Sequence, residues 1–244
     1  MIVLALCGIV VSSALAHGQW PPERLQNLKV LPSDIPIRAL VDTMAGFTRA
    51  LGVRCTYCHV GNEAADLATY DFASDSLAGK RKAREMLRMV LAINHEYLTK
   101  VPERRDPPIV VTCATCHHGI AQPRPLQQVL LVAYAAGGVD STEAAYRALR
   151  TRYYGSAAYD FGEVPLADVA AAIQRDHLAD ALRLYQLNIE VSPRSGFALR
   201  QAGAAELVAH DTAAAIADFE KALELNANDA QSKRALDIIR HKPK

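Results

Sequence analysis

The chain has 244 residues, half of them hydrophobic, which is enough for one large or two modest domains. Its net charge of +1 at pH 7 gives no electrostatic reason to expect nucleic acid or an anionic membrane surface as a partner. Alanine is abundant after position 130 and favours helices, so the sequence predicts a mainly α protein.

The N-terminal stretch 1–16 is apolar and uncharged, and it ends in Ala14-Leu15-Ala16, a small-x-small pattern typical of signal-peptide cleavage. It is too short for an ordinary transmembrane helix. We therefore expect a signal peptide over residues 1–16, cleavage after Ala16 and export to the periplasm. An uncleaved N-terminal anchor, and with it membrane association, is the alternative.

Residues 17–125 are predicted to form one domain in which helices alternate with cysteine motifs. The first helix is expected after Ser33-Asp34, a good N-cap, with Pro36 in its first turn and Gly52 as its C-cap. The second helix is expected from near Ser74-Asp75 to about Lys100, with the cationic stretch 80–84 on its exposed side. The cationic residues of that stretch are expected either to be solvated or to contact a cofactor.

Four of the five cysteines form two identical C-x-x-C-H units, and each unit is the pattern of covalent haem attachment. The two thiols add to the vinyl groups of one haem, and the adjacent histidine ligates the iron from one face. The sequence therefore predicts two c-type haems, and it assigns the following residues: Cys55, Cys58 and His59 to the first haem, and Cys113, Cys116 and His117 to the second.

A C-x-x-C unit is also compatible with a redox dithiol or with half of a zinc site, and the two units together would supply four thiolates to one zinc ion. Neither interpretation explains why a histidine follows directly in both units. Covalent haem accounts for both the cysteines and the histidines.

The sixth iron ligands are expected to be methionines, because an electron carrier normally fills both axial positions, typically with His and Met. Met44 lies on the apolar face of the first predicted helix and is the candidate for the first haem. Met86 and Met89 lie three residues apart on the second predicted helix, and their spacing alone does not choose between them. His95 competes for the same site but faces away from the apolar stripe of that helix.

Residues 126–139 are expected to form a linker helix that Gly137-Gly138 ends, and residues 140–244 a second, helical domain. A shift of 34 residues superimposes two stretches of that domain, placing Ala181 on Ala215 and Tyr185 on Phe219. A helical period of 34 residues is typical of tetratricopeptide repeats. The predicted repeats cover 162–195 and 196–229, with a capping helix over 228–241 and a helix over 141–153 at the other end.

The first domain resembles the cytochrome subunit of photosynthetic reaction centres. The resemblance is carried by NLKVLPSDI (27–35), MAGFTRALGVRCTYCHVG (44–61), AREMLRMVLAIN (83–94) and VTCATCHHG (111–119). It implies that a methionine on the helix before each motif ligates that haem, which selects Met44 and Met86 and leaves Met89 as the alternative. The family carries four haems and does not normally end in tetratricopeptide repeats, so the resemblance implies a two-haem module and does not imply photosynthesis.

These features predict an exported electron carrier with two c-type haems, whose repeat domain docks redox protein partners, among them a membrane electron-transfer complex. Two alternatives stay open. One is a haem-bearing assembly or structural subunit of a larger membrane redox complex. The other is an enzyme similar to the di-haem peroxidases, which needs one iron open to substrate.

Overall fold

The computed structural model describes residues 20–22, 24–103 and 106–241. The predicted signal peptide and its cleavage site lie outside the described residues. The chain divides into two compact units, Met1–Ala121 and Gln122–Lys244, called here the N-terminal and the C-terminal unit. In the described part of the chain no helix is long and apolar enough to span a membrane.

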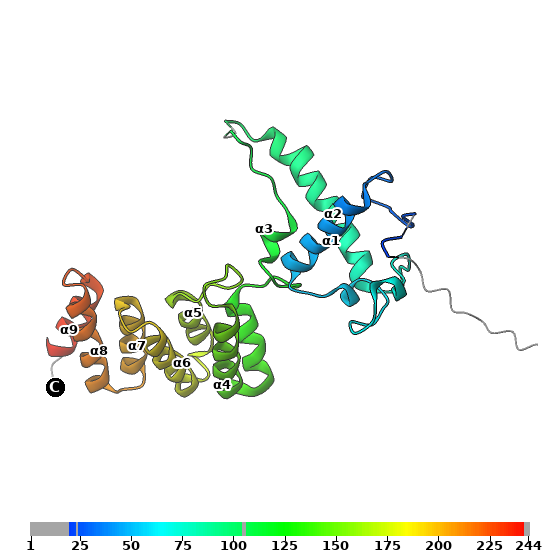
Figure 1. The fold of residues 1–244 in the computed structure, drawn as a ribbon. Coiled ribbons are helices and arrows are strands. Elements are labelled where there is room, and N and C mark those ends of the chain that lie inside the picture. The colour runs from blue at the N-terminus through cyan, green and yellow to red at the C-terminus, as the bar shows by residue number, and fades with distance from the viewer. Residues whose placement is uncertain (1–19, 23, 104–105, 242–244) are drawn as a thin grey trace, which may run out of the picture. The chain divides into compact units, whose positions relative to one another are not determined.

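The N-terminal unit contains two long helices, each of which precedes a cysteine motif, in the order that the sequence predicts (Figure 1). Short 3-10 and π-helical turns lie between and after them. In chain order the elements are α1 (Ile37–Leu51), η1 (Cys55–Tyr57), η2 (Leu67–Thr69), α2 (Ala78–Ala92), η3 (Ile93–Tyr97), η4 (Leu98–Lys100) and α3 (Cys113–His117).

Both long helices begin later than their sequence signals indicate. Pro36 occupies the N-cap position of α1, and Leu77 occupies that of α2, and neither helix has a side-chain cap. Asp75, expected near the start of α2, instead accepts hydrogen bonds from cationic side chains. The predicted C-cap of α1 is confirmed, because Gly52 lies in the left-handed region with φ of 64°.

The C-terminal unit is a row of helices joined by short connections, as Figure 1 shows. Its first helix, α4 (Leu126–Tyr153), is interrupted at Gly137 and Gly138, where the backbone leaves helical geometry. The remaining helices are α5 (Glu163–Ile173), α6 (Leu178–Val191), α7 (Gly196–Val208), α8 (Thr212–Leu225) and α9 (Ala230–His241).

The segment 126–139 was expected to be a linker, and here the structure differs. Leu126 and Leu130 are almost fully buried in the main apolar core of the C-terminal unit. Gly138 combines φ of 67° with ψ of −160°, a conformation open essentially to glycine alone, and so turns the chain between the two halves of α4. The first half of α4 is thus part of the C-terminal unit, and the two halves form a helical hairpin.

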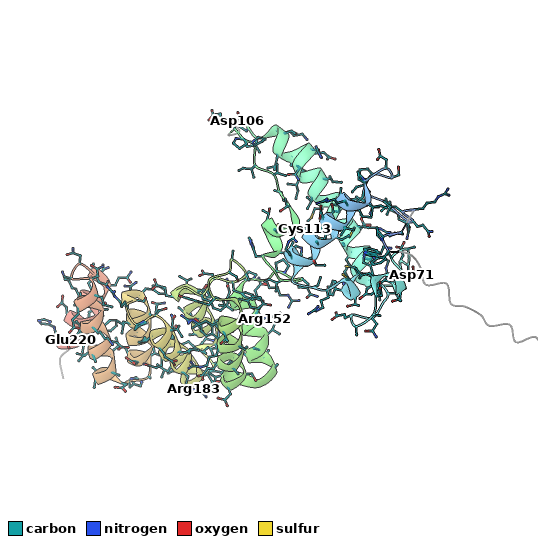
Figure 2. All side chains as sticks on the ribbon, viewed as in Figure 1. Asp71, Asp106, Cys113, Arg152, Arg183 and Glu220 are labelled. Atoms are coloured by element: carbon teal, nitrogen blue, oxygen red, sulfur yellow. The ribbon has the colours of Figure 1, made fainter. Side chains whose placement is uncertain are left out.

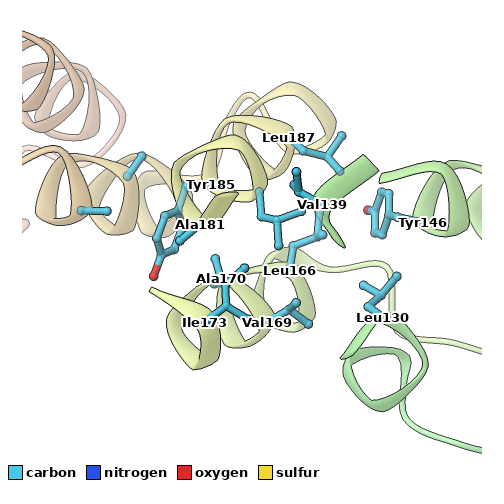
Figure 3. Close-up of a cluster of buried hydrophobic side chains, with 14 of the residues drawn as sticks. Leu130, Val139, Tyr146, Leu166, Val169, Ala170, Ile173, Ala181, Tyr185 and Leu187 are labelled. Carbon is cyan, nitrogen blue, oxygen red and sulfur yellow. The ribbon is translucent and has the colours of Figure 1, made fainter. Parts of the chain in front are cut away.

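A small residue followed four positions later by an aromatic residue recurs in the second helix of three successive hairpins. Figure 3 shows Tyr146 and the pair Ala181 and Tyr185 in the core. The buried pairs are Thr142 and Tyr146 in α4, Ala181 and Tyr185 in α6, and Ala215 and Phe219 in α8. The sequence comparison at a shift of 34 found only the last two pairs, because the connection 154–162 is longer than the connection after α6 and changes the spacing.

One carboxyl group of α7 is buried where α6, α7 and α8 meet. Glu206 is 6% exposed, and its Oε1 accepts a hydrogen bond of 3.2 Å from Gln186. Its Oε2 is buried and has no hydrogen-bond partner among the described residues. Burial, followed by the nearby carboxylates of Asp218 and Asp211, raises the pKa of Glu206 to about 7.

This raised pKa predicts how the stability of the C-terminal unit depends on pH. Between the ordinary value of 4.5 and about 7 the folded state binds a proton that the unfolded state has lost, so stability falls as pH rises through this window. Glu206→Gln should raise the free energy of unfolding by roughly 1–3 kcal/mol at pH 8 and change it little at pH 4. Urea unfolding of the 122–244 fragment at both pH values measures this. Glu224→Gln, at an exposed position of α8, is the control. An equal effect of both variants would contradict the raised pKa of Glu206 as the cause.

Candidate haem-binding sites

Each C-x-x-C-H motif folds as a single helical turn. In the first motif the His59 N–H donates to the Cys55 carbonyl at 2.9 Å. In the second motif Cys113 opens α3, as Figure 2 shows, and His117 ends it. A helical turn gathers the two thiols and the imidazole on one short stretch of chain, which one porphyrin edge and its iron require.

The four thiols are free cysteines, and two of them have perturbed acidity. Burial raises the pKa of Cys58, and the neighbouring Cys55 adds to the rise. Burial likewise raises the pKa of Cys113. Dithiol redox centres instead depend on a thiolate of lowered pKa. Among the described residues no three His, Cys, Asp or Glu side chains converge as a metal-ligand set.

The imidazole of His117 is held by a hydrogen bond to the backbone. Its Nδ1 lies 2.8 Å from the carbonyl oxygen of Ile120, which accepts the Nδ1 proton. Nε2 is then the nitrogen with the free lone pair. A ligating histidine in proteins usually has its second ring nitrogen hydrogen-bonded in this way, which selects the tautomer and the ring orientation.

The imidazole of His59 is held by aromatic packing. The edge of its ring meets Phe72, with 5.0 Å between the ring centroids. Trp20 and Tyr70 pack against the same phenyl ring. Burial lowers the pKa of His59, the nearby Lys80 adds to the lowering, and the Phe72 backbone opposes it. A lowered pKa favours the neutral imidazole, which is the form that binds iron.

A knot of charged side chains around Asp75 supports the loop that carries Phe72. Asp75 accepts hydrogen bonds from Asn27, Lys29 and Arg84 at 2.9, 2.7 and 2.7 Å. The Lys80 ammonium donates to the carbonyls of residues 72, 73 and 74 at 2.8–3.0 Å. These partners, the Arg84 guanidinium first, hold the pKa of Asp75 well below its usual range.

Two cations of the stretch 80–84 therefore have a structural role that was not predicted. The side chains of Lys80 and Arg84 are only 11% and 14% exposed and are occupied by the knot, so they are neither solvated nor directed to a cofactor. Arg81 donates to the backbone of residues 75 and 76. Arg81 and Lys82 are both exposed, as predicted, and Lys82 forms no ion pair in the described part of the chain.

The candidate methionines lie on the helices that precede the motifs. Met44 is half-buried near the middle of α1. Met86 and Met89 are 44% and 45% exposed on α2, so exposure does not choose between them. His95 is exposed on the π-helical turn η3, and His118 is exposed directly after the second motif.

The residues of the N-terminal unit fit covalently attached haem. Ala50 is the one apolar residue buried among those described in this unit, whereas several large apolar side chains of α1, α2 and the first motif are exposed. Exposed apolar surface of this kind is typical of a ligand site. The exposed residues are Val41, Tyr57, Val60, Met86, Met89 and Leu91.

Asn94 positions the second motif, and sequence reasoning did not identify it. Its side-chain amide donates to the carbonyl of Val111, and the N–H of Val111 donates back to its Oδ1, both at 2.8 Å. Asn94 lies in η3, so one π-helical turn aims this amide at the segment two residues before Cys113. A π-turn inside a helix frequently marks such a functional position.

Residues 10–129 match the family model of the photosynthetic reaction centre cytochrome C subunit. A 69-residue stretch, 28% of the chain, is 42% identical to cytochrome c-554 of Chloroflexus aurantiacus and covers 14% of that protein. The chain thus spans only a small part of this relative's length. The N-terminal unit is thus similar in sequence to cytochromes c, and the matches favour a haem-bearing subunit that transfers electrons.

The two hydrogen bonds between Asn94 and Val111, called here the Asn94 clamp, give a testable prediction. Asn94→Ala leaves the N–H and C=O groups of Val111 without their partners, which should destabilise the N-terminal unit by about 1–3 kcal/mol. Haem attachment at Cys113 and Cys116 should fall while attachment at the first motif stays. Mass spectrometry of the tryptic peptides measures the occupancy of each motif. Asn62→Ala, in the exposed loop after the first motif, is the control, and equal occupancy in both variants would contradict the positioning role.

Proposed function

We propose that this protein is an exported c-type cytochrome that binds two haems and passes electrons between redox partners. The proposal rests on the two C-x-x-C-H turns, whose thiols are free. In the second turn the Ile120 carbonyl orients the ring of His117. Covalent haem supplies an iron that exchanges one electron reversibly. The chain supplies the thiols, the imidazoles and the surroundings that tune that exchange.

Met44 and Met86 are proposed as the sixth ligands of the first and the second iron. Their helices precede the respective motifs, Met44 is half-buried and Met86 is 44% exposed, so neither side chain is fully buried in a protein core. Thioether ligation raises the reduction potential of a haem, and six-coordinate iron favours electron transfer over reaction with substrate. Met89 is the alternative to Met86.

The C-terminal unit is proposed to be a tetratricopeptide-like domain that docks a protein partner. The recurring buried pair of a small and an aromatic residue in α4, α6 and α8 supports this assignment. The matching family consists of reaction-centre subunits, and a subunit belongs to a larger complex. This match therefore suggests a membrane redox complex as the class of partner. Arrays of such hairpins commonly present extended binding surfaces.

The haem content is the first test of this function. The purified protein should carry the mass of two haems per chain after acid denaturation, because thioether bonds survive loss of the fold. Cys58→Ser should weaken attachment at the first motif only, and Cys116→Ser at the second motif only. A wild-type mass with one haem or none would refute the proposal.

The axial methionines give a second test by absorption spectroscopy. The oxidised wild-type protein should be low-spin and show the weak far-red band of sulfur-ligated ferric haem. Met44→Ala should convert the first haem to high spin and leave the second unchanged, because only one iron loses its ligand. Met86→Ala should do the same for the second haem.

Met89→Ala is the matched control, since its side chain is as exposed as that of Met86 on the same helix. If Met89→Ala opens the second haem and Met86→Ala does not, the assignment of the ligand is wrong while the function stands. A high-spin haem in the wild-type protein would favour the enzyme over the carrier.

A further inference from the structure

The end of α1 contacts the turn that follows the second haem motif. The N–H of Gly119 donates to the carbonyl of Ala50 at 2.8 Å. Figure 1 shows α3 beside this end of α1. The bond joins two segments almost seventy residues apart in the chain, and it involves the backbone alone.

Glycine is required on the α1 side of this contact. Gly52 has φ of 64°, and a Cβ atom built on it would lie 2.0 Å from the carbonyl oxygen of Gly119. Real Cβ atoms do not approach backbone oxygens so closely, so either α1 or the turn would have to move. The conformation and the space therefore both exclude a side chain at position 52.

The turn on the other side of the contact also holds the iron-ligating imidazole. The N–H of Ile120 donates to the carbonyl of His117 at 2.9 Å, and the two residues between them have positive φ. This pattern is that of a type I′ turn. The Ile120 carbonyl of this same turn accepts the Nδ1 proton of His117 at 2.8 Å.

The contact thus lies between the two attachment motifs. Gly52 is three residues before Cys55, and Gly119 is two residues after His117. A displacement of the turn by an added Cβ would pass to the His117 ring through the Ile120 carbonyl. Gly52 is also the C-cap of α1, so the same Cβ strains the end of that helix.

We propose that Gly52 and Gly119 are positioning residues that hold the two haem motifs at a fixed separation and set the orientation of the His117 imidazole. A substitution just before the first motif then changes the second haem centre. This inference rests on the proposed function, because it requires a haem at each motif.

The test uses the full-length protein with its haems, in the variant Gly52→Ala. Electron paramagnetic resonance of the oxidised protein reports the axial ligand geometry of each low-spin haem. The Cys113→Ser/Cys116→Ser double variant, which retains the first haem, assigns the two signals. Gly46→Ala is the matched control, because a Cβ there meets no atom within 4 Å and the residue lies in the same helix.

In Gly52→Ala we expect the g values of the second haem to shift, while Gly46→Ala reproduces the wild-type spectrum. Two attached haems with an unchanged second signal in Gly52→Ala would overturn this proposal alone. A wild-type protein with fewer than two haems would remove the proposed function and this proposal with it.

If Gly52→Ala does not accumulate with two haems, hydrogen exchange in the reduced wild-type protein decides. The Gly119 amide should exchange much more slowly than the amide of Asn62, a residue of an exposed loop, because the Gly119 amide donates to the Ala50 carbonyl. Exchange of both amides at the same rate would show that the contact does not hold the motifs together.

Discussion

One porphyrin can be attached through two thiols and one imidazole only if all three groups come from one short turn of chain, and the N-terminal unit is arranged around two such turns. A turn of this length has little stability of its own. Each is therefore held from outside. The Phe72 cluster and the Asp75 knot support the first motif, whereas Asn94 and the Ala50–Gly119 bond support the second.

The two units meet the need for an apolar interior in different ways. The C-terminal unit buries its own leucines, alanines and tyrosines between consecutive helices, so its core consists of side chains alone. In the N-terminal unit the described apolar residues are, apart from Ala50, half-buried or exposed. Apolar surface that is left accessible in this way is typical of a ligand site.

Local signals in the sequence failed where a distant segment competed for the same residue. Aspartate is a residue type that commonly caps helices, but Asp75 instead accepts hydrogen bonds from Lys29, Arg84 and Asn27. Helix α2 begins at Ala78 without a side-chain cap. Arg84 lies on a face that looks solvated in the sequence, but it is taken up by the same knot. Leu126 and Leu130 were assigned to a linker because the glycines after them end the helical pattern, although those glycines make the turn of a hairpin.

The sequence by itself determined the chemistry of this protein, because C-x-x-C-H is a contiguous pattern and the bonding of haem needs little else from the chain. It also determined the two long helices and part of the repeat, since amphipathic periodicity and self-similarity are local properties. Only the tertiary structure decided how the two motifs are joined. The Gly52–Gly119 approach joins two backbone segments, and the Asn94 clamp joins a side-chain amide to the backbone of another segment. No periodicity or composition of the sequence records which distant backbone a glycine or an amide will meet.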